Sequence, residues 1–173
     1  MLNRRQLVAY GAFAICAVGG SIAALGEETL APPQDPVILT VTGAIANTNA
    51  PGRADFDLAN LEHLGLSKLV TWTPWTEGEI EFEGVLARRL MAAVGAKGTE
   101  VHATALNQYD ETIPLADFQS YDVLLALRMN GRPMRVRDKG PIWVIYPWAD
   151  HPELDDFLTR EKSVWQLTAL DVR

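Results

Sequence analysis

The chain has 173 residues, a length typical of one domain, with 22 acidic against 15 basic residues and a formal net charge of −7. This surplus of negative charge argues against nucleic acid or an anionic membrane surface as a partner. The only cysteine is Cys16, inside an apolar N-terminal segment. The chain beyond that segment therefore offers no disulfide, no thiolate metal ligand and no cysteine nucleophile.

Residues 1–26 are expected to be an export signal. Arg4 and Arg5 precede an uncharged apolar run from Leu7 to Leu25, and Ala24-Leu25-Gly26 places small residues where a signal peptidase reads. A retained membrane anchor is the alternative, because the run approaches spanning length. The arginine pair also fits a loose twin-arginine pattern, which would mean export in the folded state. We expect a periplasmic protein with no direct membrane insertion after signal cleavage.

The rest of the chain is expected to form a lead-in linker over residues 27–36, which hold three prolines, and one domain over residues 37–173. The residue patterns predict strands at 37–42, 54–56, 68–73, 99–106, 122–129, 141–147 and 163–172, and helices at 58–63, 85–94 and 152–159. Asp57 is the expected cap of the first helix, and Gly95 ends the second. Strands outnumber helices without alternating regularly with them, which indicates a single compact α+β domain.

Residues 70–78 hold two of the chain's five tryptophans. Val70 to Thr73 are β-branched or aromatic and predict a strand, which Pro74 ends. Trp72 then lies in the strand and Trp75 just past its end, where sheet proteins commonly bind ligands. The alternative is a tryptophan pair that fills the core beneath a loop.

A period-two row of acids follows this stretch. Glu77, Glu79, Glu81 and Glu83 alternate with other residues and would share one face of an extended segment. One interpretation is a site for a cationic ligand or a metal. The other, which we prefer, is a solvated sheet edge whose charges resist aggregation.

Two further segments suit a flat, polar heterocycle. Asn107, Tyr109 and Asp110 lie on a turn after a strand, where an amide and a carboxylate can read the edge of a ring, although plain turn chemistry explains the same residues. Lys139-Gly140 can bring a cation and bare backbone close to a ring carbonyl. The chain has no P-loop, dinucleotide-binding glycine motif, HExxH or nucleophile elbow, so no motif indicates bond-breaking chemistry.

Eight short segments occur along the chain in an order that is typical of one known domain family. They are Ile38–Gly43, Phe56–Leu61, Phe82–Leu90, Tyr109 with Ile113–Leu115, Asp122–Ala126, Met129–Met134, Gly140–Pro147 and Ser163–Trp165. This series resembles the sulfite-oxidase-fold, molybdopterin-binding domain family, and it covers nearly all of the chain after residue 36. The resemblance implies a sulfite-oxidase-like mixed sheet in one domain.

One departure from that family is informative. Its enzymes bind molybdenum through a cysteine thiolate in the region that corresponds to Thr71–Trp75, where this chain has no sulfur. Threonine is a hard, weakly acidic ligand that does not replace a soft thiolate. The chain therefore resembles a non-catalytic branch, the periplasmic PruR-type regulators. These bind a reduced pterin without molybdenum and dock on the periplasmic domain of a membrane-bound cyclic-di-GMP synthase/phosphodiesterase, which changes biofilm formation.

The expected ligand is thus a reduced pterin, and the expected partner is the periplasmic domain of a membrane-bound signalling protein. No catalytic or metal-binding residue is expected. The residues expected to hold the pterin are Trp72, Trp75, Asn107, Tyr109, Asp110, Lys139 and Trp165. Two alternatives stay open, a molybdopterin-dependent oxidoreductase with an atypical metal site and a fold used only as a protein-interaction module. The missing thiolate favours the regulator over the oxidoreductase.

Overall fold

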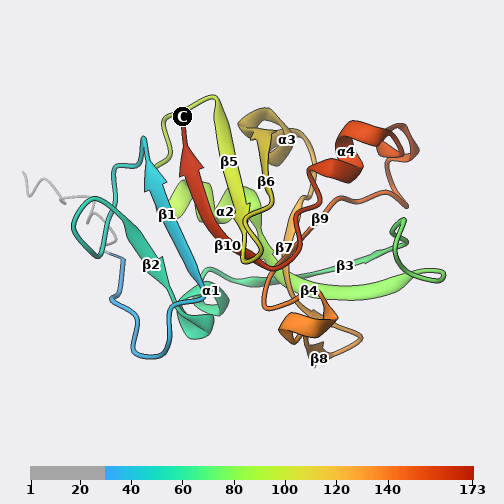
Figure 1. Cartoon of the computed structure of the whole chain (residues 1–173), viewed down its shortest axis with the longest axis horizontal. Coiled ribbons are helices and arrows are strands. Elements are labelled where there is room, and N and C mark those ends of the chain that lie inside the picture. Colours follow the sequence, from blue (N-terminus) through green and yellow to red (C-terminus); the bar gives the residue numbers. More distant parts are fainter. Residues whose placement is uncertain (1–29) are drawn as a thin grey trace, which may run out of the picture.

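Alternating apolar and polar side chains build the first of two sheets in residues 30–173, the part of the chain that the computed structural model describes (Figure 1). Its strands are β1 (Leu39–Gly43), β2 (Ala54–Phe56), β5 (Glu100–Ala105), β6 (Asp110–Pro114) and β10 (Leu167–Val172). Their spatial order is β2-β1-β10-β5-β6. β1 runs parallel to β10, and the other neighbours are antiparallel. In β5 the alternate residues Val101, Ala103 and Ala105 are buried, so one face of this sheet packs on the core.

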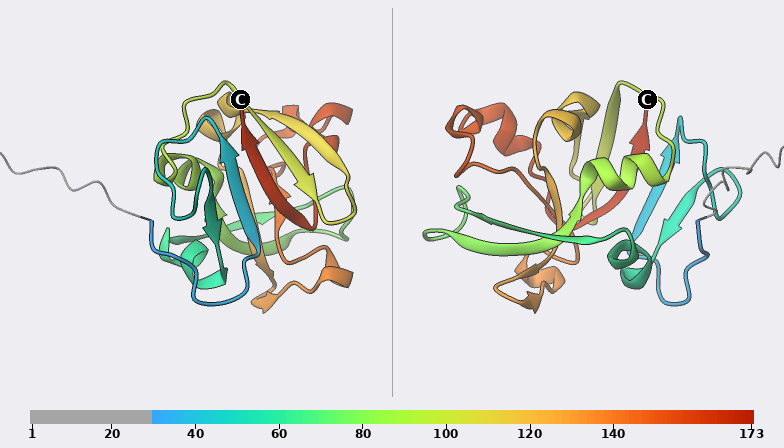
Figure 2. Two further views of the ribbon diagram at one scale, coloured as in Figure 1. Left: turned by 60° about the vertical axis from the view of Figure 1, so that its left-hand side comes forward. Right: turned by 180° about the vertical axis from the view of Figure 1, so that it is seen from behind.

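The second sheet is antiparallel and has the order β3-β4-β7-β8, with β9 also paired to β7. Its strands are β3 (Leu66–Thr71), β4 (Ile80–Leu86), β7 (Leu124–Met129), β8 (Arg132–Pro133) and β9 (Trp143–Ile145). Figure 2 shows β3 and β4 as a long hairpin that extends away from the first sheet. The approach of β4 to β7 requires glycine at position 84, because a Cβ there would lie 2.0 Å from the carbonyl oxygen of Leu125.

The helices are short and lie at the borders of the sheets. They are α1 (Leu58–His63), α2 (Ala87–Ala93), α3 (Leu115–Ser120) and α4 (Phe157–Glu161), with 3₁₀ turns η1 (Val136–Asp138) and η2 (Pro152–Leu154). The expected cap of α1 is confirmed, since the Asp57 carboxylate accepts from the backbone N–H of Asn60 in a complete capping box. Gly95 follows α2 with a φ of 61°, as expected of a residue that ends a helix. Figure 2 also shows α2 against the rear of the first sheet.

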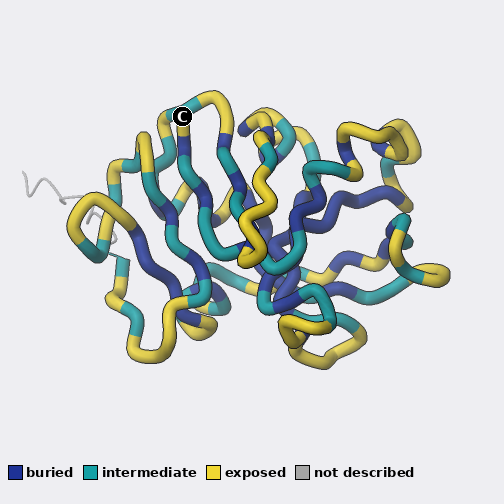
Figure 3. Tube along the Cα trace, in the orientation of Figure 1, coloured by how far each residue is buried: buried dark blue, intermediate teal, exposed yellow. Residues whose placement is uncertain are grey.

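The core lies between these elements, and the buried parts of the trace meet where the two sheets adjoin (Figure 3). The largest fully buried side chains include Trp143, Trp148 and Tyr146, which come from β9 and the residues after it. This aromatic part of the core lies behind the candidate site described below. The expected α+β architecture with a mixed sheet is confirmed.

Two expected elements near the C-terminus have different bounds. Residues 152–159 were expected to be one helix, but η2 and α4 divide the segment, because the Asp156 carboxylate accepts from the backbone N–H groups of Leu158 and Thr159 and starts a new helix. The last strand was expected from residue 163, but β10 begins at Leu167. Gln166 before it has a φ of 53°, which an extended strand does not accommodate.

The expectation of a solvated sheet edge is wrong for Glu81 and Glu83, whereas Glu77 and Glu79 lie exposed in the turn before β4. β4 lies inside its sheet, between β3 and β7. Glu81 pairs with Lys68 at 2.9 Å and Glu83 pairs with Arg128 at 2.7 Å, so neighbouring strands neutralise these two acids. Nor does the structure support a metal site here, since residues 30–173 hold no group of three or more His, Cys, Asp or Glu side chains that could bind a metal ion.

The expected export signal lies outside the described residues. Within residues 30–173, none of the helices has the length and apolar character needed to cross a membrane.

Candidate ligand pocket

A small aromatic hollow lies where the end of α4 meets the turn after β5. It is lined by Trp75, Ala105, Asn107, Tyr109, Arg160, Glu161, Ser163, Val164 and Trp165. Its volume is about 150 Å³, below the roughly 300–1,000 Å³ of pockets that hold drug-sized ligands. The hollow therefore suits a single flat ring system and is too small to enclose a dinucleotide cofactor.

Every tryptophan of the chain belongs to one connected cluster behind this hollow. Trp75 lies at its centre, with ring centroids 5.4 Å from Trp165, 5.9 Å from Trp143 and 6.3 Å from Trp148. Trp72 joins through Trp148 at 6.1 Å. Separations of this size are those of favourable edge-to-face and tilted aromatic pairs. The cluster gives the pocket a rigid aromatic wall.

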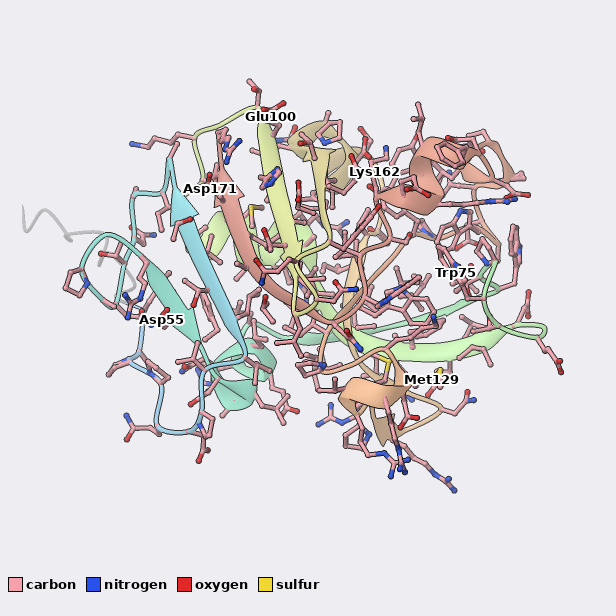
Figure 4. All side chains as sticks on the ribbon, viewed as in Figure 1. Asp55, Trp75, Glu100, Met129, Lys162 and Asp171 are labelled. Atoms are coloured by element: carbon pink, nitrogen blue, oxygen red, sulfur yellow. The ribbon has the colours of Figure 1, made fainter. Side chains whose placement is uncertain are left out.

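Local hydrogen bonds fix Trp75 at the tip of the β3–β4 hairpin. Its backbone N–H donates to the Thr73 hydroxyl at 3.2 Å, and that hydroxyl lies 3.0 Å from the hydroxyl of Thr76. The expected strand ends earlier than Pro74: β3 stops at Thr71, so Trp72 lies just past its end and Pro74 is in the turn that follows. Trp75 is 36 % exposed, although it contacts three other indoles. Part of Trp75 is therefore open to a ligand, and Figure 4 shows this residue near the β3–β4 hairpin.

Trp165 is held by the residue that follows it. The Gln166 N–H donates to the carbonyl of Lys139 at 3.0 Å, and the Gln166 carbonyl accepts from the N–H of Leu106 at 2.9 Å. Trp165 itself forms an isolated bridge with Trp143. One short segment thus ties together the loop after η1, the turn after β5 and the pocket wall.

Tyr109 and Glu161 connect the two sides of the pocket. The Tyr109 hydroxyl lies 3.1 Å from the carbonyl oxygen of Glu161 and 3.1 Å from its carboxylate Oε2, and its one proton is shared between these two acceptors. Burial and the hydrogen bond to Glu161 together raise the pKa of Tyr109 to about 12. At neutral pH, Tyr109 is therefore a protonated phenol that orients the Glu161 carboxylate.

The second charged residue of the pocket, Arg160, already has a partner. Its guanidinium pairs with the Asp155 carboxylate, with Nη2 and Nε 2.5 Å and 3.2 Å from Oδ1. Both side chains are partly exposed, so this pair contributes little to stability. Its main consequence is that Arg160 is held beside the pocket with its charge balanced.

Lys139 approaches the aromatic wall as a cation. Its Nζ lies 3.8 Å from the centroid of the Trp165 ring and 5.2 Å and 5.8 Å from those of Trp143 and Trp75. Burial lowers the pKa of Lys139. The residue has a φ of 73°, a left-handed conformation that is uncommon outside glycine.

Four of the seven expected ligand residues line the pocket: Trp75, Asn107, Tyr109 and Trp165. A fifth, Lys139, rests on the tryptophan wall. The other two lie elsewhere. Trp72 is partly buried and packs on Trp148 against the core, and Asp110 is in β6, where its carboxylate lies 3.1 Å from the ring of His102.

The acid that the structure brings to the pocket is Glu161, which the sequence analysis did not select. Arg160, Ser163, Val164 and Ala105 were also missed. The available signal was an Arg-Glu pair four to five residues before Trp165. Asp110 adjoins Tyr109 in sequence, but it is the first residue of β6 and its carboxylate pairs with His102 on the neighbouring strand β5.

Molybdenum bound through a thiolate does not fit the described residues. Thr71 and Thr73 occupy the region where the resemblance places a cysteine, and both are buried. The Thr71 hydroxyl accepts from the N–H of Ala149 at 2.9 Å and lies 3.1 Å from the carbonyl of Trp72. Both hydroxyls are therefore engaged in internal hydrogen bonds, and neither supplies the soft thiolate sulfur that the resemblance places here.

The two adjoining sheets and the short border helices define an α+β domain of the sulfite-oxidase-like type. A family model described as the oxidoreductase molybdopterin binding domain matches residues 51–149, more than half of the chain, and the chain belongs to this family. The match includes Trp75, Asn107 and Tyr109, whereas Glu161 and Trp165 lie beyond it.

Among solved structures, the crystal structure of the sulfane dehydrogenase SoxCD from Paracoccus pantotrophus is similar, with a TM-score of 0.58 at 18% sequence identity. The similarity covers 78% of this chain and 37% of that chain, so this chain spans little more than a third of the length of its structural relative. At this identity the likeness shows the fold. No curated protein matches the chain.

Proposed function

We propose that this protein is a periplasmic pterin-binding protein that works without a molybdenum–thiolate bond and regulates a membrane-bound, cyclic-di-GMP-metabolising protein. The pocket is the observation that supports pterin binding. It brings Trp75, Tyr109 and Trp165 together with the carboxylate of Glu161 and the amide of Asn107, in a space that fits one ring system. Aromatic faces stack on flat heterocycles, and polar groups at the rim fix their orientation. The family's description as molybdopterin-binding makes a pterin the natural candidate for that ring.

The chemistry of the donors supports binding without the metal. The chain has one cysteine, Cys16, far from the pocket in sequence, and the hydroxyls of Thr71 and Thr73 are already hydrogen-bonded. A ligand held by stacking and hydrogen bonds needs no thiolate. The competing function is an oxidoreductase with an atypical metal site, and elemental analysis separates the two.

The regulatory part of the proposal is supported by the surface of α4. Phe157 and Leu158 on this helix are 71% and 69% exposed, and the same helix contributes Arg160 and Glu161 to the pocket. Adjacent exposed apolar side chains of this size suit a contact with another protein. A ligand that contacts the end of α4 thus has a direct connection to a surface that a partner can bind.

The test of ligand binding uses protein purified from the periplasm of its native host. We expect a released compound whose fluorescence after oxidation identifies it as a pterin, at about one per chain. Protein that carries no pterin and does not bind one when titrated would contradict the proposal.

For regulation, cellular cyclic-di-GMP is compared between the wild type and a Phe157→Ser, Leu158→Ser double variant that retains pterin. Unchanged cyclic-di-GMP in cells that lack the protein altogether would contradict the regulatory role.

A further inference from the structure

The charges of the pocket are unequally balanced. Arg160 and Glu161 are the charged residues that line it, and Arg160 is paired with Asp155. Glu161 forms no ion pair with any residue between 30 and 173, and the donor that reaches its carboxylate is the Tyr109 hydroxyl. An ionised carboxylate has about four acceptor positions on its two oxygens. Glu161 therefore brings unused acceptor positions to a pocket that Trp75 and Trp165 also line.

The position of this carboxylate is also fixed. The one proton of the Tyr109 hydroxyl is shared between the backbone carbonyl and Oε2 of Glu161, so the phenol contacts the main chain and the side chain of the same residue. Behind Glu161 the helix is anchored by Lys162, whose Nζ lies 2.6 Å from the Asp117 carboxylate, and that carboxylate also accepts from the Tyr146 hydroxyl at 2.8 Å. An acceptor pair held in this way is prepared for a ligand with matching donors, which lowers the entropic cost of binding.

We propose that Glu161 determines the specificity of the pocket by accepting two parallel hydrogen bonds from a ring that presents an amino group beside a ring N–H. Tyr109 is the positioning residue for this carboxylate. The inference rests on the proposed pterin-binding function and extends it, because it names the edge of the ring that is read and the residue that reads it. Pterins carry this donor pair, as do guanine-type rings.

The geometry of the donor pair explains why a carboxylate is needed. Two adjacent N–H groups on a planar ring match the two oxygens of a carboxylate, as one side of a guanidinium does, and such bidentate bonds are strong and directional. In lumazine, a carbonyl oxygen replaces the amino group of pterin. That oxygen would face the Glu161 carboxylate, acceptor against acceptor, and a buried group would be left without a partner. The site is expected to reject lumazine and to accept pterin.

The test is a titration of pterin and lumazine into the full chain and its variants, in the absence of oxygen when reduced rings are used. The wild type should prefer pterin over lumazine by at least about ten-fold. Glu161→Gln should weaken pterin binding by about ten- to hundred-fold and bring the two affinities together, because its amide presents a donor where an acceptor was. Asp110→Asn is the matched control, since this acid pairs with His102 outside the pocket and its loss should leave both affinities unchanged.

A second substitution tests the role if Glu161→Gln alters folding. Glu161→Asp keeps the charge but retracts it, so pterin affinity should fall while the preference for pterin over lumazine persists. If the wild type binds pterin and Glu161→Gln keeps both the affinity and the preference, the inference about Glu161 is overturned and the proposed function stands. If the wild type binds neither ring, the proposed function and the inference both fail.

Discussion

The indole of Trp75 meets the indole of Trp165 edge to face, with ring centroids 5.4 Å apart and planes inclined by 82°. Ninety positions separate these residues in sequence, and they come from the β3–β4 hairpin and from the segment before β10. Their contact brings the hairpin tip against the C-terminal part of the chain. The ligand pocket depends on this contact, because each indole supplies part of its wall.

Substitution of these two tryptophans should weaken ligand binding. Trp75→Ala and Trp165→Ala are each expected to cost about 1–3 kcal/mol of pterin binding through lost stacking, measured by titration of a reduced pterin. Trp72→Ala is the matched control. Trp72 packs on Trp148 away from the pocket, so its loss should lower the melting temperature while the affinity stays the same. Equal affinities for all three variants and the wild type would place the ligand elsewhere.

Protein produced together with the genes for molybdenum-cofactor synthesis should carry no stoichiometric molybdenum. The physical reason is the lack of a thiolate ligand, since Thr71 and Thr73 stand in the region where the resemblance places a cysteine. Elemental analysis after gel filtration measures this directly. Cys16→Ser is the control that removes the chain's one thiol. About one molybdenum per chain in either protein would favour the oxidoreductase and contradict the regulator.

Much of the fold could be predicted because its signals are local. Asp57 precedes an apolar helical pattern and caps α1, and the Asn130-Gly131 pair forms the turn between β7 and β8 with φ values of 48° and 71°. The β4 strand was harder to place, because a row of acids looks the same at a solvated edge and between two basic neighbours. Only the positions of Lys68 and Arg128 on adjacent strands distinguish these cases.

The pocket was predicted in part for the same reason. Trp75, Asn107 and Tyr109 stand next to strand ends that the sequence marks, so they could be selected locally. The choice between Asp110 and Glu161 could not be made this way, because both are acids near turns. The choice depends on the fold of the C-terminal segment. There Asp156 caps α4, and Glu161, the last residue of this helix, contacts the Tyr109 hydroxyl.

Tyr109 should titrate late and in a manner that depends on Glu161. Its pKa of about 12 arises first from burial and then from the hydrogen bond to Glu161, so Glu161→Gln should lower the pKa part of the way toward the ordinary value of about 10. The measurement is tyrosinate absorbance against pH, with Tyr109→Phe subtracted to isolate this phenol. An unchanged pKa in Glu161→Gln would show that Tyr109 does not donate to this carboxylate in solution.

The raised pKa of Tyr109 also predicts that the protein loses stability at alkaline pH. In the unfolded chain Tyr109 loses its proton near pH 10, whereas in the folded protein it keeps the proton until about pH 12. The folded state therefore binds more protons in this interval, and the contribution of Tyr109 to stability is present below about pH 10 and lost as the pH rises to about 12. Tyr109→Phe should lose less stability than the wild type over this interval.

Asp57 should contribute to stability in a way that acid removes. Its carboxylate is 1% exposed and accepts from the N–H groups of Asn60 at 2.7 Å, Gln34 at 2.7 Å and Asp35 at 3.0 Å, so it caps α1 and also holds the lead-in segment. These hydrogen bonds, led by that from Asn60, lower the pKa of Asp57. At a pH between the folded pKa and the unfolded pKa of about 3.9, the unfolded chain binds more protons, so the stabilisation is present above about pH 4 and is lost as the pH falls through the folded pKa.

Asp57→Ala should cost about 2 kcal/mol of stability at neutral pH, and Asp57→Asn, which can still cap the helix, should cost less. Urea unfolding at neutral pH and near pH 3 measures both effects, with Asp122→Ala as the control because its exposed pair with Arg88 contributes little. A wild type and an Asp57→Asn variant that lose equal stability on acidification would show that this carboxylate is not the group that titrates.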